Sequence, residues 1–377
     1  MRILPTPEQE ILLNQHIDTC RWVWNYMLAE HERFYKETNQ HLSGYSMMKI
    51  LSDLKRTDEF HWLTQVSAFS LNRICRDLDF AFQQFFQKNC GYPKFKSKKT
   101  AKRTFPVRDS NNTVYFNTDD TVHIERIGMI KCRMSKYVPY GRDIKIMNPR
   151  ISVQNNKWIL TIVIGCENQA VNLSTVPMGI DLGVKDLATV AYGNNITKIP
   201  NINKTIRVKN LERKINHIRR VINRKKRRKE SQNKPDSNRI IKYRRMLKRC
   251  YSKLTNIRKD YIHKITSMLV YTLKPSTIIM EDLNIYGMMM NKRLSKSIQD
   301  QNWGLFIRCM KYKAESIGST FILADRFYPS SRTCSSCGTI NTNLKLRDRI
   351  FKCPNCGIVI DRDVNAAVNL RNYLVTS

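Results

Sequence analysis

Four cysteines toward the C-terminal end of the sequence have the spacing of metal ligands. Cys334 and Cys337 form one pair, and Cys353 and Cys356 form a second pair after 15 intervening residues. A glycine follows each pair and relieves the tight turn there. Two such pairs can place four thiolates around one tetrahedral Zn²⁺ ion. We therefore expect one structural zinc ion, in preference to disulfides or a redox-active pair.

Acidic residues in three other apolar segments could bind a different metal. Asp181 interrupts an apolar strand, Glu281 and Asp282 end another, and Asp361 and Asp363 lie where a helix begins. Carboxylates suit hard cations, and three of them could hold two Mg²⁺ ions that activate water against a phosphodiester. The residues alone leave a plainer interpretation equally open, in which Asp361 is a helix cap and Asp282 a surface acid.

The segments around these acids are typical of a mixed α/β core. We expect strands over 177–183, 185–192, 276–280 and 320–324, and a helix over 364–374. Acids at strand ends and at a helix start, around one such core, suit a two-metal site.

Positive charge is concentrated in one part of the chain. The 377 residues include 66 Lys and Arg against 31 Asp and Glu, for a net charge of +35. Residues 201–260 hold 23 of the basic residues and only four acids, and residues 91–110 hold seven bases and one acid. Such a local surplus predicts contact with nucleic acid. No apolar run is long enough to cross a membrane, so we expect a soluble, cytoplasmic protein without a membrane partner.

Apolar residues at helical spacing flank the most basic run. One stripe extends from Leu211 to Ile222 and another from Tyr243 to Tyr261, with turn-forming residues near 230–238. This pattern predicts two long antiparallel helices with their basic residues facing outward. The bases expected to contact phosphates are Arg219, Arg220, Arg224, Lys225, Lys226, Arg227 and Arg228.

The N-terminal part has a different pattern. Thr6, Pro7 and Gln9 are typical of a helix start, and helical patterns follow over 46–56 and 67–88. From about residue 104 to 172 the period changes to two, which predicts a β-rich module. Polar residues here that could reach base edges are Tyr45, Asn72, Asn111 and Asn112.

Short motifs along the whole chain share the order of one known family. They are Thr6-Pro-Glu-Gln-Glu10, Gly91-Tyr-Pro-Lys-Phe-Lys-Ser-Lys-Lys99, Gly179-Ile-Asp181-Leu-Gly183, Ile279-Met-Glu281-Asp282-Leu283-Asn284, Tyr328-Pro-Ser-Ser-Arg-Thr-Cys334, Cys353-Pro-Asn-Cys356-Gly357 and Asp361-Arg-Asp363-Val-Asn365-Ala-Ala367. Together they resemble the TnpB family, transposon-encoded RNA-guided DNA endonucleases related to the type V CRISPR effectors.

The resemblance implies a multidomain α/β architecture. Its expected parts are an N-terminal strand and helical recognition domain (1–95), a β-barrel wedge domain (96–172), a RuvC (RNase H-like) nuclease in three parts (173–200, 275–330 and 361–377), a basic helical hairpin (201–274) and a zinc ribbon (331–360). The family usually has a longer first strand before Leu4-Pro5 than the three residues found here. This departure implies either a start further upstream or a shorter wedge strand.

The resemblance also implies roles for the acids and partners for the protein. Asp181, Glu281 and Asp363 become the catalytic ligands of two Mg²⁺ ions, with Asp282 and Asp361 as neighbours. The expected partners are a guide RNA made from the transposon end and double-stranded target DNA beside a short duplex motif. One protein copy per RNA, working at a prokaryotic nucleoid, is expected.

Two other functions share many of these residues. A guide-RNA-dependent DNA-binding repressor would lack one or more of the three acids, and all three are present here. A strand-transfer transposase would share the acids, but a zinc ribbon between the second and third acids fits TnpB better. RNA-guided DNA cleavage is therefore the expected function.

Overall fold

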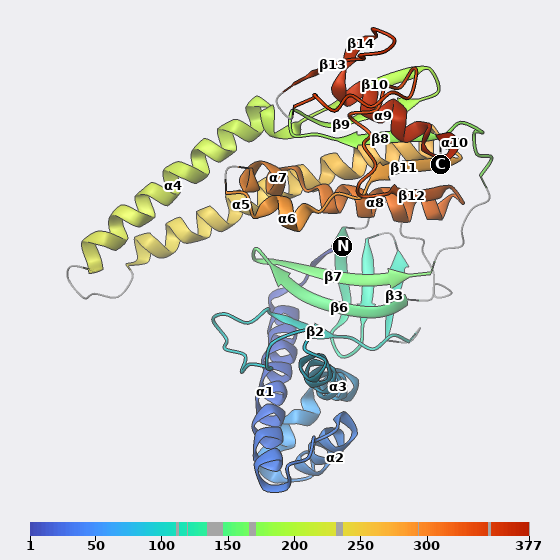
Figure 1. The fold of residues 1–377 in the computed structure, drawn as a ribbon. Helices are drawn as coiled ribbons and strands as arrows, with labels where there is room; N and C mark the ends of the chain where they lie inside the picture. The colour runs from blue at the N-terminus through green and yellow to red at the C-terminus, as the bar shows by residue number, and fades with distance from the viewer. Residues whose placement is uncertain are drawn as a thin grey trace. The chain divides into compact units, whose positions relative to one another are not determined.

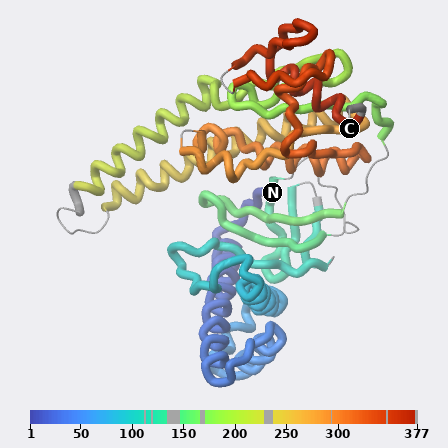
Figure 2. Tube along the Cα trace, in the orientation of Figure 1, coloured from blue at the N-terminus to red at the C-terminus, as the bar shows by residue number. Residues whose placement is uncertain are grey.

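The computed structural model divides the chain into two compact units. The described residues are 1–110, 113–118, 120–133, 146–165, 171–230, 237–292, 294–345 and 348–376, without the side chains of 118, 228–230 and 375–376. The units are Met1–Cys166 and Glu167–Ser377 (Figure 1 and Figure 2). Each has a hydrophobic core of its own.

The first unit combines helices with one antiparallel sheet (Figure 1). Its helices are α1 (Pro7–Thr38), α2 (Gly44–Leu54), the 3₁₀ helix η1 (Asp58–Gln65) and α3 (Ala68–Phe86). Its strands are β1 (Arg2–Leu4), β2 (Thr104–Pro106), β3 (Val114–Thr118), β4 (Thr121–Ile124), β5 (Gly128–Arg133), β6 (Ile146–Gln154) and β7 (Lys157–Ile164). The strand order is β2-β6-β7-β1-β5-β4-β3.

Helix α1 begins where the sequence predicts. Thr6 Oγ1 accepts a hydrogen bond from Gln9 N at 3.3 Å, and Gln9 Oε1 accepts one from Thr6 N at 3.0 Å. This reciprocal cap satisfies amides that the first helical turn leaves without partners, and Pro7 supplies a fixed φ. The predicted helix start at Thr6 is confirmed.

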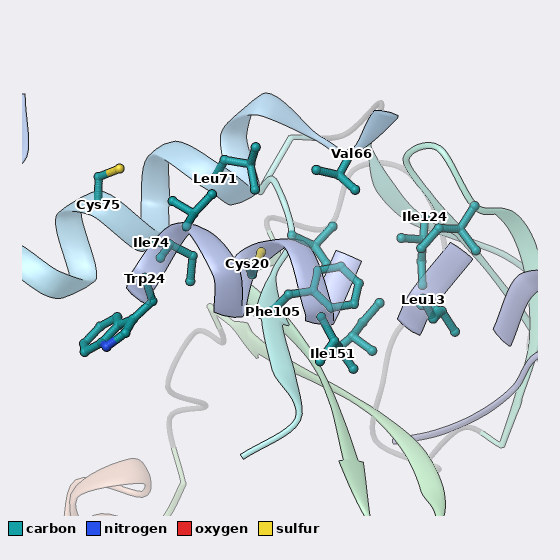
Figure 3. Close-up of a cluster of buried hydrophobic side chains, with 14 of the residues drawn as sticks. Leu13, Cys20, Trp24, Val66, Leu71, Ile74, Cys75, Phe105, Ile124 and Ile151 are labelled. Atoms are coloured by element: carbon teal, nitrogen blue, oxygen red, sulfur yellow. The ribbon is translucent and has the colours of Figure 1, made fainter. Parts of the chain in front are cut away.

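Helices and strands of the first unit share one core. Figure 3 shows Leu13 and Cys20 of α1 gathered with Phe105 of β2 and Ile151 of β6. The three-residue β1 pairs with both β5 and β7, so the N-terminal strand belongs to the sheet. Among the described strands, no pairing joins β2 to β3, and the closed wedge barrel stays a prediction.

The second unit is built around a five-stranded mixed sheet. Its strands are β8 (Met178–Leu182), β9 (Asp186–Tyr192), β10 (Asn195–Pro200), β11 (Thr277–Glu281) and β12 (Thr320–Ala324), with β13 (Ile350–Lys352) and β14 (Val359–Asp361) as a separate pair. Its helices are the 3₁₀ helix η2 (Ile202–Lys204), α4 (Ile206–Glu230), α5 (Asn238–Ser267), the π-helix η3 (Met268–Thr272), α6 (Ile285–Met289), α7 (Ser295–Gln301), α8 (Trp303–Ser316), α9 (Arg362–Arg371) and α10 (Tyr373–Thr376). The sheet order is β10-β9-β8-β11-β12.

Alternate residues of β8 and β11 face opposite layers of helices. Ile180 and Met280 lie in the core that includes α5 and α8. Ile279 lies on the other face, in contact with Leu370 of α9. Because a strand has a period of two, Gly179, Asp181 and Glu281 face the α9 side as well. The sheet therefore has an apolar face and a face on which acids approach α9.

The basic segment forms the predicted helical hairpin. Helices α4 and α5 run antiparallel and side by side, the yellow-green and yellow stretches of Figure 2. Val208 and Ile215 of α4 pack on Leu254 of α5, with Leu211 and Leu247 beside them. The apolar stripes read from the sequence are therefore the contact surface of the hairpin.

Sequence reasoning missed part of the second unit. It did not foresee β10 or the helices α6, α7 and α8. Helix α8 is the most consequential of these, because its Phe306 and Met310 are fully buried against the sheet. Within the described part of the chain, no helix is both long and apolar enough to span a membrane.

Candidate metal centres

Two of the three acids lie near the ends of neighbouring parallel strands, Asp181 one residue before the end of β8 and Glu281 at the end of β11. The pairing of β8 with β11 runs from Met178 opposite Ile278 to Ile180 opposite Met280. The next residues are Asp181 and Glu281, whose Cα atoms therefore lie about 5 Å apart, the usual spacing of paired strands. Both are half-buried and lie on one face of the sheet.

Helix α9 brings the third acid to this face. Asp361 caps the helix by accepting a hydrogen bond from Asp363 N at 3.0 Å, which places Asp363 in the first turn. The helix crosses β8 at Gly179, where an added Cβ would overlap the carbonyl oxygen of Ala367 and lie 2.9 Å from the Cα of Arg371. A glycine is needed at this crossing for α9 to carry Asp363 so close to the sheet.

Burial and neighbouring charges alter the ionisation of Asp181 and Glu281. Burial raises the pKa of Asp181 well above its usual range, and the nearby Glu281 and Asp363 raise it further. Burial also raises the pKa of Glu281, opposed by a hydrogen bond from Ser330 Oγ to Glu281 Oε1 and by the charge of Arg362. Arg362 offsets part of the negative charge, and a bound cation would offset more.

The neighbouring acids already have cationic partners. Asp282 pairs with Arg326 at 2.6 Å, and Asp361 pairs with Lys198 at 2.6 Å. Partial burial raises the pKa of Asp361, but the hydrogen bonds from Lys198 and from the backbone amides that it caps lower the pKa by more. Asp361 is therefore a helix cap held by a lysine, as the plainer interpretation of this residue predicts.

The donor set of the acid cluster suits hard divalent cations. Carboxylate oxygens are ligands that Mg²⁺ prefers. Among the described residues, the four cysteines are the group of possible ligands whose donor atoms all lie within 4.8 Å of one another. The three carboxylates supply oxygen ligands from one face of the sheet, so the chemistry of the donor set fits Mg²⁺.

The four predicted cysteines converge on a single point. Sγ of Cys334 lies 3.6 Å from Sγ of Cys356, and Sγ of Cys337 lies 3.5 Å from Sγ of Cys353. Tetrahedral zinc with Zn–S bonds of about 2.3 Å requires sulfurs about 3.8 Å apart, far beyond a disulfide bond. Hydrogen bonds from Thr339 lower the pKa of Cys337 to about 5, which favours the thiolate.

Backbone geometry in both cysteine turns also fits a zinc ribbon. Gly338 and Gly357, each directly after the second cysteine of a pair, have φ of 77° and 72°. A side chain is strained at such angles, so glycine lets each turn close around a metal. The strands β13 and β14 pair with each other and flank the second cysteine pair.

The predicted nucleic-acid contacts lie on surfaces but show no single site. Arg219, Arg220, Arg224, Lys226 and Arg227 are exposed on α4, and Lys225 is half-buried. Arg228 is on the same helix, with its side chain outside the description. Tyr45 is 75% exposed and Asn72 is half-buried. Asn111 and Asn112 lie outside the described residues.

Sequence reasoning missed two groups that touch the acids. Ser330 lies within a recognised motif, but its bond to Glu281 depends on the chain returning from β12 to β11. Arg362 was read as part of a motif, and its effect on both Asp181 and Glu281 follows from the docking of α9. The sequence signal available for Arg362 was its position between Asp361 and Asp363.

Comparison with protein families gives three matches in chain order. A family described as "Helix-turn-helix domain" matches residues 1–40, and one described as "Probable transposase" matches residues 151–292. One described as "Cas12f1-like, TNB domain" matches residues 303–370, which include all four cysteines and Asp363.

Related proteins align over much of the chain. A Streptomyces pristinaespiralis protein named as an RNA-guided DNA endonuclease is 29% identical over 98% of this chain and 87% of its own length. InsQ of Escherichia coli K12, named in the same way, is 26% identical over 98% of this chain and 90% of its length. The TnpB-like protein L79 of Acanthamoeba polyphaga mimivirus is 26% identical over 63% of this chain and 45% of its length.

A solved structure has a similar fold. The protein in a cryo-EM structure of a Cas12f1–sgRNA–target DNA complex superposes with a TM-score of 0.62, over 97% of this chain and 83% of that protein, at 16% identity. The similarity supports a multidomain α/β fold. The ordered motifs, the three family matches and the relatives named as RNA-guided DNA endonucleases and as TnpB-like all support the resemblance of this chain to the TnpB family.

Proposed function

We propose that this protein is an RNA-guided DNA endonuclease whose cleavage site is the acid cluster of the second unit. The observation that carries the proposal is the meeting of Asp181, Glu281 and Asp363 on one sheet face, each lying in a family motif. The names of the Streptomyces and Escherichia relatives support guided DNA cleavage as the activity.

The strand order supports a RuvC-type nuclease. In sequence order within the sheet, three antiparallel strands are followed by two parallel ones, arranged 3-2-1-4-5. We assign the first three to residues 173–200, the next two to 275–330, and α9 to 361–377. The hairpin (201–274) and the ribbon (331–360) are then insertions between these parts.

Each acid has a defined task in the proposed reaction. Asp181, Glu281 and Asp363 would hold two Mg²⁺ ions, which supply an activated water and stabilise the leaving oxygen of the phosphodiester. Ser330 holds one oxygen of Glu281 and so fixes the direction in which the other points. Lys198 keeps Asp361 engaged as a cap, so that the first turn of α9 presents Asp363.

The remaining parts are assigned to nucleic acid. The exposed bases of α4 form a row suited to the phosphates of the guide RNA or of its hybrid with the target strand. We assign the duplex motif beside the target to the first unit, with Tyr45 and Asn72 as candidate contacts. The four cysteines would hold one structural Zn²⁺ ion that stabilises the ribbon.

Strand transfer is the second candidate function. The family description matched by residues 151–292 names a transposase, and strand transfer uses a similar set of carboxylates. Cleavage by water and attack by a DNA 3′ end give different products: separate ends in the first case and joined molecules in the second.

One experiment tests the proposal and separates the two candidates. The protein is expressed with its native flanking DNA and purified, and the RNA that stays bound is sequenced. A discrete RNA running from the element end into adjacent sequence is expected, and a plasmid carrying the matching target should be cut in Mg²⁺. Absence of a defined RNA would overturn RNA guidance, and joined rather than cut products would favour strand transfer.

A further inference from the structure

Two buried asparagines of α9 bind the loop that leads into the zinc ribbon. Asn365 is fully buried and Asn369 is 5% exposed. They are four residues apart, so they lie on the same face of the helix, one turn from each other. A buried amide without partners is destabilising, so these side chains have a structural task in this interface.

Asn365 holds the backbone on both sides of the first zinc ligand. Its Nδ2 donates to the carbonyl oxygen of Thr333 at 2.6 Å, and its Oδ1 accepts from Ser335 N at 2.9 Å. Cys334 lies between these two residues. The side chain therefore clamps the peptide units on either side of Cys334 and fixes where its sulfur points.

Asn369 joins the same loop to the acid cluster. Its Nδ2 donates to the carbonyl oxygens of both Thr333 and Ser330, each at 2.7 Å. The hydroxyl of Ser330 in turn donates to Glu281 Oε1. A continuous set of hydrogen bonds thus leads from Cys334 through two amides of α9 to a carboxylate of the acid cluster.

We propose that Asn365, Asn369 and Ser330 couple the zinc ribbon to Glu281, so that occupancy of the cysteine site sets the affinity of the acid cluster for divalent cations. They are positioning residues, because they act on Glu281 and Cys334 and not on the substrate. The helix that carries both asparagines also carries Asp363, so a shift of the loop disturbs two of the three acids. The inference rests on the proposed function for its activity readout only.

Coupling of this kind is reciprocal. If zinc in the ribbon strengthens divalent binding at the acids, a divalent ion at the acids strengthens retention of zinc by the same factor. Removing a hydrogen-bond partner of a metal ligand commonly lowers metal affinity by about 10- to 100-fold. Loss of the Ser330 hydroxyl should therefore weaken divalent-ion binding at the acids only. Loss of either asparagine side chain should weaken both divalent-ion binding at the acids and zinc binding at the cysteines.

The test compares three variants of the purified full-length protein, with any RNA that stays bound. Asn365→Ala and Asn369→Ala remove central members of the set of hydrogen bonds, and Ser330→Ala removes only the bond to Glu281. Asn343→Ala, an exposed residue of the same ribbon, and Ser331→Ala, beside Ser330, are the matched controls. Two quantities are measured: the rate of zinc loss to a chromogenic chelator, with and without Mn²⁺, and the Mn²⁺ concentration giving half-saturation, by titration calorimetry and by cleavage.

The expected results differ between the variants. Ser330→Ala should raise the half-saturating Mn²⁺ concentration about tenfold with unchanged zinc loss in the absence of Mn²⁺. Asn365→Ala should raise the half-saturating Mn²⁺ concentration by a similar factor and should also lose zinc faster. In the wild type, Mn²⁺ should slow the loss of zinc. Asn369→Ala, which leaves the Ser335 bond intact, repeats the test if Asn365→Ala does not fold.

Two results would overturn the coupling. One is faster zinc loss in the asparagine variants with an unchanged Mn²⁺ titration, which would confine them to the ribbon. The other is zinc loss from the wild type that is indifferent to Mn²⁺. If calorimetry and zinc loss behave as expected while the wild-type complex cuts no DNA, the coupling stands and the proposed function fails.

Discussion

The two candidate metal centres of the second unit are assembled in different ways. The cysteine cluster comes from two short turns of one ribbon, and its sulfurs are already 3.5–3.6 Å apart in each cross pair. The acid cluster comes from β8, β11 and α9, and Glu281 and Asp363 raise the pKa of Asp181. The turns of one local segment position the four cysteines. The packing of distant segments positions the three acids, and this packing must also overcome the repulsion between their carboxylates.

The difference predicts which changes affect chemistry and which affect folding. On the proposed function, loss of an acid should remove cleavage and relieve the repulsion at Asp181. If the cysteines bind zinc, loss of a cysteine should remove folding energy, because zinc binding and folding of a small ribbon are linked.

Asp181→Ala should reduce DNA cleavage by about a thousandfold or more, because metal ions at such sites supply several kcal/mol of transition-state stabilisation. Binding of guide RNA and target should persist. Cleavage is measured on a plasmid and binding by gel shift. Asp282→Ala, which removes an ion pair with Arg326, is the matched control and should cut far better. Equal loss of binding and cleavage in Asp181→Ala would mean that the acid is structural.

Cys353→Ser should abolish zinc binding and unfold the ribbon locally. The residue is 5% exposed and belongs to the sulfur cluster, and structural zinc supplies on the order of 10 kcal/mol in small ribbons. Zinc content by mass spectrometry should fall from one ion to none, with faster proteolysis within 331–360. Cys90→Ser, at an exposed cysteine outside the cluster, should retain zinc. Full zinc content in Cys353→Ser would contradict the assignment of the ligand.

Gly179→Ala should destabilise the second unit by about 1–3 kcal/mol, the usual cost of forcing an atom into a packed contact. The added Cβ would overlap the backbone of α9, so the helix and Asp363 must shift. Thermal unfolding measures the loss, and cleavage should fall with it. Gly91→Ala, where the added atom meets nothing within 4 Å, should leave the melting temperature unchanged. An unchanged melting temperature in Gly179→Ala would refute the close crossing of β8 by α9.

Asp181→Asn should raise the melting temperature of the zinc-bound protein in the absence of Mg²⁺ at pH 7.5. A folded pKa above the unfolded value makes stability fall as the pH rises through that interval, so ionised Asp181 is destabilising at neutral pH. The amide has no charge and avoids this loss. The gain should vanish well below pH 3.8, where Asp181 holds its proton in both the folded and the unfolded state. A variant no more stable than the wild type at pH 7.5 would show that the acids do not repel.

The same contrast explains what the sequence could reveal. Cysteine spacing and following glycines identify the ribbon because its geometry is local, and the stripes of α4 and α5 predict their packing for the same reason. The capping residues around Thr6 likewise identify the start of α1. These features depend on residues within a few turns of one another.

Features that depend on distant contacts were not accessible in this way. The sequence does not reveal that Ser330 binds Glu281 or that Gly179 lies under α9, because both require strands and helices far apart in the chain to meet. Helix α8 was missed although its buried side chains cover much of one sheet face. The acids themselves were identified through family motifs, and their charge interactions followed only from the fold.

The docking of α9 across Gly179 has a consequence for the timing of protein synthesis. A ribosome releases β8 and β11 well before α9, and segments of a nascent chain fold roughly in the order of synthesis. Asp181 and Glu281 therefore emerge without Asp363, so a nascent chain would lack the complete acid cluster that we propose as the cleavage site. A message with a premature stop codon in the ribbon would yield a protein that keeps its basic hairpin but lacks Asp363 and, on the proposed function, would not cut DNA.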